Sequence, residues 1–193
     1  MRFEDLPQLA AWRHRGVRDG YEVAFMRSGE DGFLFQGGCA AIEQPHAWVV
    51  NYVIVLEPGW LTRGALLSAR SGAGSHELSL EADGTGSWRV NGVSAPHLDG
   101  CLDVDLEASA LTNACPVHRL ELEVGAAAAA PAAYVRAVDL TVERLEQRYV
   151  RLEDAGNGER YHYTAPGFGF ECTLEYDEFG LVRDYPRIAT RTA

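Results

Sequence analysis

The sequence feature that decides the fold class is a double alternation of charged and hydrophobic residues, which reads Asp99-Gly-Cys-Leu-Asp-Val-Asp-Leu-Glu-Ala-Ser-Ala-Leu-Thr-Asn-Ala-Cys-Pro-Val-His-Arg-Leu-Glu-Leu-Glu-Val124. Successive side chains of a strand point to opposite faces, so each half predicts a strand with one apolar and one charged face. The two predicted strands, 101–106 and 117–124, are joined by a bend at Thr112-Asn113. Because antiparallel sheets commonly have one face in water, we expect the charged face to be solvated, with an internal cavity as the alternative.

The same alternation recurs along the chain and predicts an all-β protein. The runs are bounded by Gly, Asp, Asn and Pro, including turn signals at Asn91-Gly92 and 156–158. We expect a single domain over residues 1–193, built as an antiparallel β-roll or open barrel with little helix. The remaining predicted strands are 21–27, 32–36, 47–56, 76–82, 87–90, 134–142, 148–152, 160–164, 168–176 and 181–184.

Three segments are less clear. The alanine tract 126–133 follows Gly125 and contains Pro131, so we expect a loop there. Segment 68–75 is expected to be a surface loop. Segment 140–152 fits either a helical stripe or a strand interrupted in its middle, and we favour strand, turn, strand.

The composition restricts the classes of function. The chain carries a net charge of −11, and none of its 17 basic residues is lysine. The negative charge repels nucleic acid and anionic membrane surfaces, so we expect neither as the main partner. The lack of lysine excludes Schiff-base chemistry and the lysine of a P-loop.

The cysteines and the N-terminal segment bear on cofactors and location. The four cysteines form no Cys-x-x-Cys pair, so we expect free buried thiols and neither a metal nor a cofactor. The first twelve residues lack the pattern of a secretion signal, and no segment approaches the ~20 apolar residues of a membrane helix. We therefore expect a cytoplasmic protein without stable membrane insertion. The sequence leaves the oligomeric state open.

A carboxylate pair is the main candidate for chemistry. Asp103 and Asp105 share one face of a predicted strand and lie about 7 Å apart, from a rise of about 3.3 Å per residue. That distance suits general acid–base work across a glycosidic bond, but only burial would raise the pKa of one carboxyl enough. Arg119, in the other predicted strand, is a partner for either aspartate. Such a pair acts as a structural clamp when buried and contacts a ligand when exposed.

Two tryptophans differ in context from the others. Trp60 lies beside a bend with Arg63 three residues on, and Trp88 lies in a short strand between turns. Indoles at strand ends can stack on sugar rings or acyl chains, and core packing is the alternative.

Several ordered segments resemble the bacterial glycolipid-binding family, and together they cover most of the chain. That resemblance implies a spiral β-roll of antiparallel strands that binds a glycolipid or a similar amphiphile. The segments are Trp60-Leu-Thr-Arg63, Gly86-Ser-Trp-Arg-Val-Asn-Gly92, Leu98-Asp-Gly-Cys-Leu-Asp-Val-Asp-Leu106, Thr112-Asn113, Pro116-Val-His-Arg-Leu120, Gln147-Arg-Tyr149 and Gly180-Leu-Val-Arg-Asp-Tyr-Pro186.

The resemblance also implies a ligand-binding site. Its polar cluster comprises Asp103, Asp105, Asn113, Arg119, Gln147 and Tyr149, and its cleft is lined or closed by Trp60, Arg63, Trp88 and Tyr185. The chain departs from the family pattern at 109–111, where Thr-Pro-Phe is usual, and at His118, where the first of two arginines is usual. The loss of one guanidinium weakens an anion site there, and the histidine introduces sensitivity to pH.

We therefore expect non-enzymatic binding of an amphiphilic small molecule in a groove of a curved sheet. The head would contact Asp103, Asn113 and Arg119, and the tail would lie on apolar side chains. Two alternatives stay open at this point. One is a hydrolase or other enzyme that modifies glycans or lipids with Asp103 and Asp105, and the other is a structural module with a buried ion-pair network.

Overall fold

One large, curved sheet organises the structure, a computed structural model that describes residues 3–156 and 158–193. Its fourteen strands follow the order β10-β13-β14-β15-β16-β17-β1-β2-β3-β4-β5-β6-β7-β8, and all neighbouring pairs are antiparallel. Within the described residues the outermost strands β10 and β8 do not pair with each other, so the sheet does not close into a barrel. The expected open, antiparallel, mostly-β fold is confirmed.

The strands of this sheet are β1 (Leu9–His14), β2 (Asp19–Gly29), β3 (Gly32–Glu43), β4 (His46–Leu56), β5 (Thr62–Ser71), β6 (Gly74–Ala82), β7 (Trp88–Val90), β8 (Val93–Ser94), β10 (Ala127–Ala129), β13 (Arg148–Ala155), β14 (Gly158–Ala165), β15 (Phe170–Tyr176), β16 (Val182–Tyr185) and β17 (Ala189–Arg191). A second sheet has the order β12-β11-β9, with β9 (Asp103–Leu106), β11 (Ala132–Val135) and β12 (Val142–Leu145). The helical segments are α1 (Ala114–Leu120) and the 3-10 turns η1 (Pro96–Leu98), η2 (Leu111–Asn113) and η3 (Pro166–Phe168).

The long strands alternate strictly between a buried and an exposed side. In β4, Trp48, Val50 and Tyr52 point inward and are almost fully buried, whereas Val49 and Val55 point outward. Alternation with period two is what a sheet with a single buried face produces. The core therefore lies on the inner, concave side.

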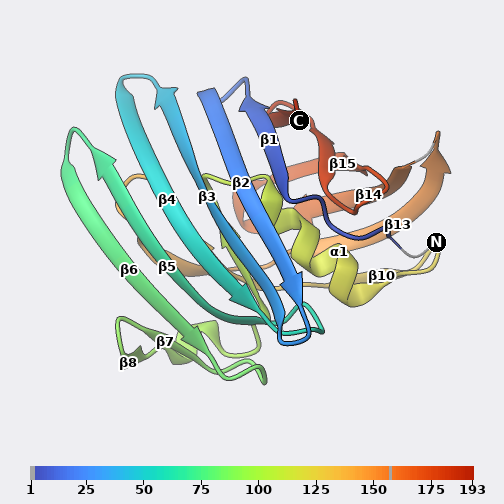
Figure 1. The fold of residues 1–193 in the computed structure, drawn as a ribbon, viewed down its shortest axis with the longest axis horizontal. Coiled ribbons are helices and arrows are strands. Elements are labelled where there is room, and N and C mark those ends of the chain that lie inside the picture. Colours follow the sequence, from blue (N-terminus) through green and yellow to red (C-terminus); the bar gives the residue numbers. More distant parts are fainter. Residues whose placement is uncertain (1–2, 157) are drawn as a thin grey trace.

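A segment of the chain fills that concave side. We call residues 96–120, from η1 through β9 and η2 to α1, the plug. In Figure 1, α1 lies behind and beside the blue strands β1 and β2, and the orange strands β13 and β14 lie on its other side. Contacts agree with this view: the main chain of Ala110 binds Glu22 of β2, and the Tyr176 hydroxyl of β15 donates to the carbonyl of Asn113 at 3.1 Å. The sheet thus wraps around the plug.

The second half of the alternating segment does not form the expected strand. Residues 114–120 form α1, and the charged face of β9 is buried rather than solvated. The helix is compatible with Pro116, because proline is tolerated in a first turn. Val117 is fully buried against the core. The alternating residues 121–124 that follow the helix form no strand and pair with none. The expectation of two charged strand faces in water is therefore wrong.

Other segment predictions had mixed outcomes. The alanine tract forms β10 and β11 on either side of Pro131 instead of a loop, and 68–75 continues the β5–β6 hairpin. The predicted strand 134–142 is interrupted after Val135. The strand, turn, strand prediction for 140–152 is confirmed by β12 and β13. The predicted turn at 156–158 includes Asn157, which lies outside the described residues.

Candidate ligand-binding site

A cavity of about 180 Å³ lies between the small sheet and the inner face of β14–β16, and we call it the inner cavity. Most of its polar side chains come from the plug, Arg18 comes from the β1–β2 connection, and most of the rings come from the large sheet. The residues that line it are Arg18, Asp105, Leu106, Glu107, Ser109, Asn113, Tyr134, Leu145, Tyr163, Ala165, Phe168, Phe170, Tyr185 and Ile188.

The polar floor of the inner cavity is built around Asp105. Its Oδ1 accepts a hydrogen bond from the Thr112 hydroxyl at 2.9 Å, and its Oδ2 accepts one from the Gln147 amide at 2.5 Å. Beside it, the Tyr149 hydroxyl donates to Asn113 Oδ1 at 3.2 Å. Burial raises the pKa of Asp105 to about 6, although both donors favour the carboxylate. The floor therefore carries an acid that titrates close to neutral pH.

Aromatic rings form the wall opposite this floor. Tyr163, Phe170 and Tyr185 pack with ring centroids 6.0 to 6.2 Å apart. Phe168, 42% exposed, contacts the edge of Tyr134 with centroids 5.2 Å apart, so this pair lies where the cavity approaches the surface. The inner cavity is amphipathic, with hydrogen-bonding groups on one side and rings on the other.

Asp103 does not line the inner cavity and binds Arg119 instead. Arg119 Nη2 lies 2.5 Å from Asp103 Oδ2, and Arg119 Nε lies 3.2 Å from Asp103 Oδ1, so both carboxylate oxygens are bound. Burial raises the pKa of Asp103, and the guanidinium works against that rise. The side chain of Asp103 is only 3% exposed and that of Arg119 only 13%, which makes this a desolvated ion pair.

Trp60 lies near Arg119, but its side chain is buried and two other rings pack against it. The ring stacks on His118 at 3.7 Å with an interplanar angle of 9°, and the Phe33 ring lies 4.3 Å away. A surface hollow of about 420 Å³ touches Trp60, His118 and Arg119. A sugar could stack on the indole only after His118 or Phe33 moved.

Two sequence candidates lie elsewhere. Arg63 makes an exposed ion pair with Glu57 at 3.0 Å. Trp88 is buried in the core, where its indole N–H donates to the Cys101 carbonyl at 2.8 Å. Neither residue contributes to the inner cavity.

The structure therefore divides the ten candidate residues into groups. Asp105, Asn113 and Tyr185 line the inner cavity, and Gln147 and Tyr149 hold its floor through the hydrogen bonds above. Arg119 and Trp60 line the separate surface hollow, and Asp103 is buried and bound to Arg119. Arg63 and Trp88 are apart from both cavities. A role in ligand binding stays a prediction for all of them.

Sequence reasoning missed a buried carboxylate next to the inner cavity. Glu22 of β2 is fully buried, and its Oε1 accepts hydrogen bonds from the Tyr52 hydroxyl at 2.7 Å and from the Ser109 hydroxyl. Its Oε2 accepts the main-chain N–H of Ala110 at 2.7 Å. Burial raises the pKa of Glu22 to about 7. The only signal in the sequence was a charge at an inward position of an alternating strand.

These features define a class of protein: an open, curved β-roll that wraps a plug and encloses a small amphipathic cavity. A family model described as "Putative glycolipid-binding" matches residues 9–191, and the chain belongs to this family. The resemblance seen in the sequence is thereby confirmed. No curated protein matches the chain. Among the described residues, no helix combines the length and apolar character needed to cross a bilayer.

Two solved structures resemble this one. A DUF1089 family protein from Pseudomonas aeruginosa is 31% identical, with 89% of this chain and 92% of that chain covered and a TM-score of 0.74. A beta-barrel-like protein of the domain of unknown function DUF1849 from Brucella abortus is 10% identical, with 98% and 95% covered and a TM-score of 0.57. The second likeness extends to the fold alone.

Proposed function

We propose that this protein binds an amphiphilic small molecule, such as a glycolipid, without covalent chemistry, and that the inner cavity holds the polar head. The observation that carries the proposal is the division of that cavity into a polar floor at Asp105 and Asn113 and a wall of Tyr163, Phe170 and Tyr185. Ligand sites are typically apolar pockets with a few fixed polar groups. Membership of the family supports the same class of ligand.

The size and chemistry of the inner cavity limit what it can enclose. Its volume of about 180 Å³ is below the roughly 300–1,000 Å³ of typical ligand pockets. The cavity therefore encloses one part of an amphiphile, and the remainder extends outward past Phe168. Each oxygen of Asp105 accepts one hydrogen bond from the protein and keeps a second lone pair, which suits a hydroxyl-rich head.

Mass spectrometry tests this proposal directly. Purified protein is measured under native conditions before and after solvent extraction, and the extracted apoprotein is titrated with an alkyl glucoside. We expect co-purified amphiphile or one-to-one uptake of the glucoside, with Asp105→Asn weakening uptake at least tenfold. Asp31→Asn, an exposed loop carboxylate, is the matched control and leaves uptake unchanged.

Tyr185→Phe provides a second variant that keeps the ring wall intact. A modest loss of glucoside binding in this variant, with an unchanged circular dichroism spectrum, supports contact between the head and this hydroxyl. A clean apoprotein that takes up neither lipid nor glucoside contradicts the proposal.

A hydrolase is the second candidate function, and the observation that favours it is the raised pKa of Asp105. Because Arg119 binds both oxygens of Asp103, only Asp105 of the two faces the inner cavity. A two-carboxylate mechanism in this cavity therefore cannot use the pair Asp103 and Asp105, and the other carboxylate that lines the cavity is Glu107. Turnover of a chromogenic glycoside or ester that disappears in Asp105→Asn would favour the enzyme over the binding protein.

A further inference from the structure

The outward side of β2–β6 is unusually apolar for a surface, and we call it the outer face. Strand register aligns Phe25, Gln36, Val53 and Leu66 in one row across β2–β5 and Leu34 with Val55 in the next. Phe25 is 56% exposed and Leu66 60%. Contiguous exposed apolar surface of this kind marks an interaction site.

We propose that the outer face binds a second copy of this chain through a two-fold axis that runs along the strands between β3 and β4. Such an axis exchanges the β2 side of one copy with the β5–β6 side of the other. From the register, Phe25 then meets the partner copy's Leu66, and Leu34 meets its Val55. The interface is isologous, because each contact occurs twice.

The surface shape of the outer face supports this pairing. A hollow of about 620 Å³ lies over β4–β6 and is lined by Val53, Leu66, Ser68 and Glu77, among others. Phe25 protrudes on the opposite side of the same face. The two-fold axis brings each Phe25 ring over the hollow of the other copy. Shape is thereby complementary at both symmetry-related contacts.

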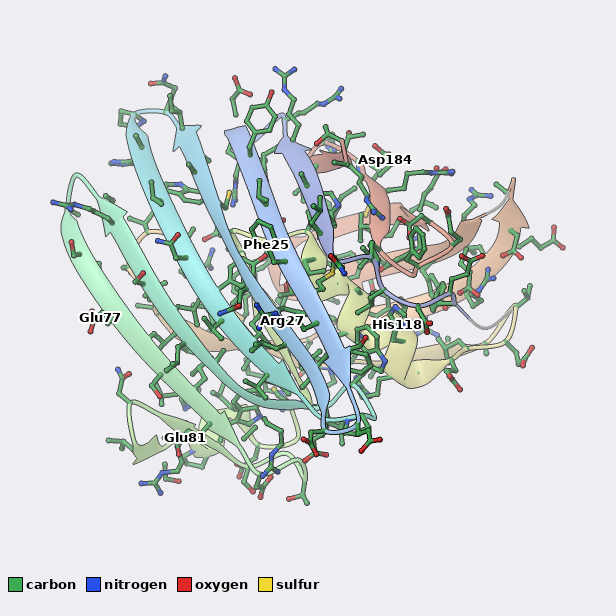
Figure 2. All side chains as sticks on the ribbon, viewed as in Figure 1. Phe25, Arg27, Glu77, Glu81, His118 and Asp184 are labelled. Atoms are coloured by element: carbon green, nitrogen blue, oxygen red, sulfur yellow. The ribbon has the colours of Figure 1, made fainter. Side chains whose placement is uncertain are left out.

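The charges of the outer face support the same partner. Arg27 is exposed on β2, whereas Glu77 and Glu81 are exposed on β6, and Figure 2 shows them at opposite sides of the face. Within residues 3–156 and 158–193, none of these three takes part in an ion pair. Arg27 and Glu81 belong to one row, so the two-fold axis places each arginine over Gly64 of the other copy's β5, one strand spacing of about 4.8 Å from that copy's Glu81 and within reach of both long side chains. An anionic membrane would instead be repelled by both glutamates.

The area is adequate for a specific dimer. A patch five strands wide and four rows long presents roughly 650 Å², from a strand spacing of about 4.8 Å and about 6.7 Å between alternate residues. A standard protein interface uses about 800 Å² per partner. The outer face is thus close to the size of a moderate-affinity interface.

Sedimentation velocity and light scattering of the full chain over a range of concentrations test the proposal. We expect a particle of twice the 21.1 kDa chain mass at high concentration. Phe25→Asp should give the single-chain mass at every concentration. Val124→Asp changes another exposed apolar residue, one that lies outside the sheet, and should leave the dimer intact. A wild-type protein that is monomeric at every concentration overturns the proposal, and so does a dimer that Phe25→Asp leaves unchanged.

A charge exchange tests the partner and the register together. Arg27→Glu and Glu81→Arg should each raise the dimer dissociation constant at least tenfold, and the double variant should restore it. A double variant no better than the single ones contradicts the proposed axis. A final measurement uses vesicles of phosphatidylcholine and phosphatidylglycerol. If the protein is a monomer that sediments with these vesicles, and Phe25→Asp abolishes the sedimentation, the outer face is a membrane contact and the dimer is overturned.

Discussion

At the scale of single residues, Arg119 is expected to contribute strongly to stability. Within the residues that the structure describes, its guanidinium is the only hydrogen-bonding partner of the buried Asp103 carboxylate, so Arg119→Leu leaves an uncompensated charge in the core. Breaking one side of a buried ion pair typically costs about 3 to 5 kcal/mol. We expect a loss of that size in the free energy of unfolding, measured by urea denaturation.

Arg63→Leu is the matched control, since Arg63 pairs with Glu57 at the surface. Exposed ion pairs contribute less than about 1 kcal/mol, and this variant should be nearly neutral. Asp103→Asn combined with Arg119→Leu should recover part of the loss, because no buried charge then remains. Equal, small effects of Arg119→Leu and Arg63→Leu would show that Asp103 is not desolvated in solution.

At the scale of elements, the hydrogen bonds of Glu22 attach β2 to the start of η2. Glu22→Ala would leave the hydroxyls of Tyr52 and Ser109 and the N–H of Ala110 unpaired, at about 1 to 3 kcal/mol for each buried group. We expect a destabilisation of several kcal/mol and faster hydrogen exchange at the amides of 110–117, measured by mass spectrometry. Glu123→Ala, at an exposed loop position, should change neither quantity.

The elements also show how much of the fold could be predicted from the sequence. Most strands of the large sheet were predictable, because alternation over six or more residues has few other physical causes. The helix α1 was not, since seven residues give no periodic stripe and Leu120, Leu122 and Val124 continue a strand-like alternation. The inward side of β2 was equally hidden: Tyr21, Val23 and Phe25 point outward there, so hydrophobicity alone assigns the wrong face.

The candidate site was also predictable only in part. Asp105 with Gln147 and Asn113 with Tyr149 do form two hydrogen-bonded pairs at the floor of one cavity. The family resemblance implied that Arg119 belongs to this polar cluster and Trp60 to the cleft beside it, yet both line a separate hollow. Tertiary placement of this kind depends on how the plug crosses the sheet, which no local pattern specifies.

At the scale of the whole molecule, the buried ionisable groups change the pH dependence of stability in opposite directions. Burial lowers the pKa of His14 and of His118 from 6.5 to about 4, so the unfolded chain binds protons there before the folded protein does. The free energy of unfolding therefore falls as pH drops from 6.5 to about 4. Glu22 acts in the opposite sense: its pKa is raised from 4.5 to about 7, so its contribution is lost as pH rises through that range.

His118→Phe separates these opposing contributions. A phenyl ring keeps the stack on Trp60 and loses only the contact between His118 Nε2 and the Phe179 carbonyl at 3.0 Å. Relative to the wild type, the variant should gain about 3 kcal/mol in unfolding free energy between pH 6.5 and pH 4, at about 1.36 kcal/mol for each factor of ten in proton affinity. Denaturation at several pH values measures this gain, with His46→Phe at an exposed position as control. Parallel pH profiles for His118→Phe and the wild type would show that His118 takes up its proton as readily in the folded protein as in the unfolded chain.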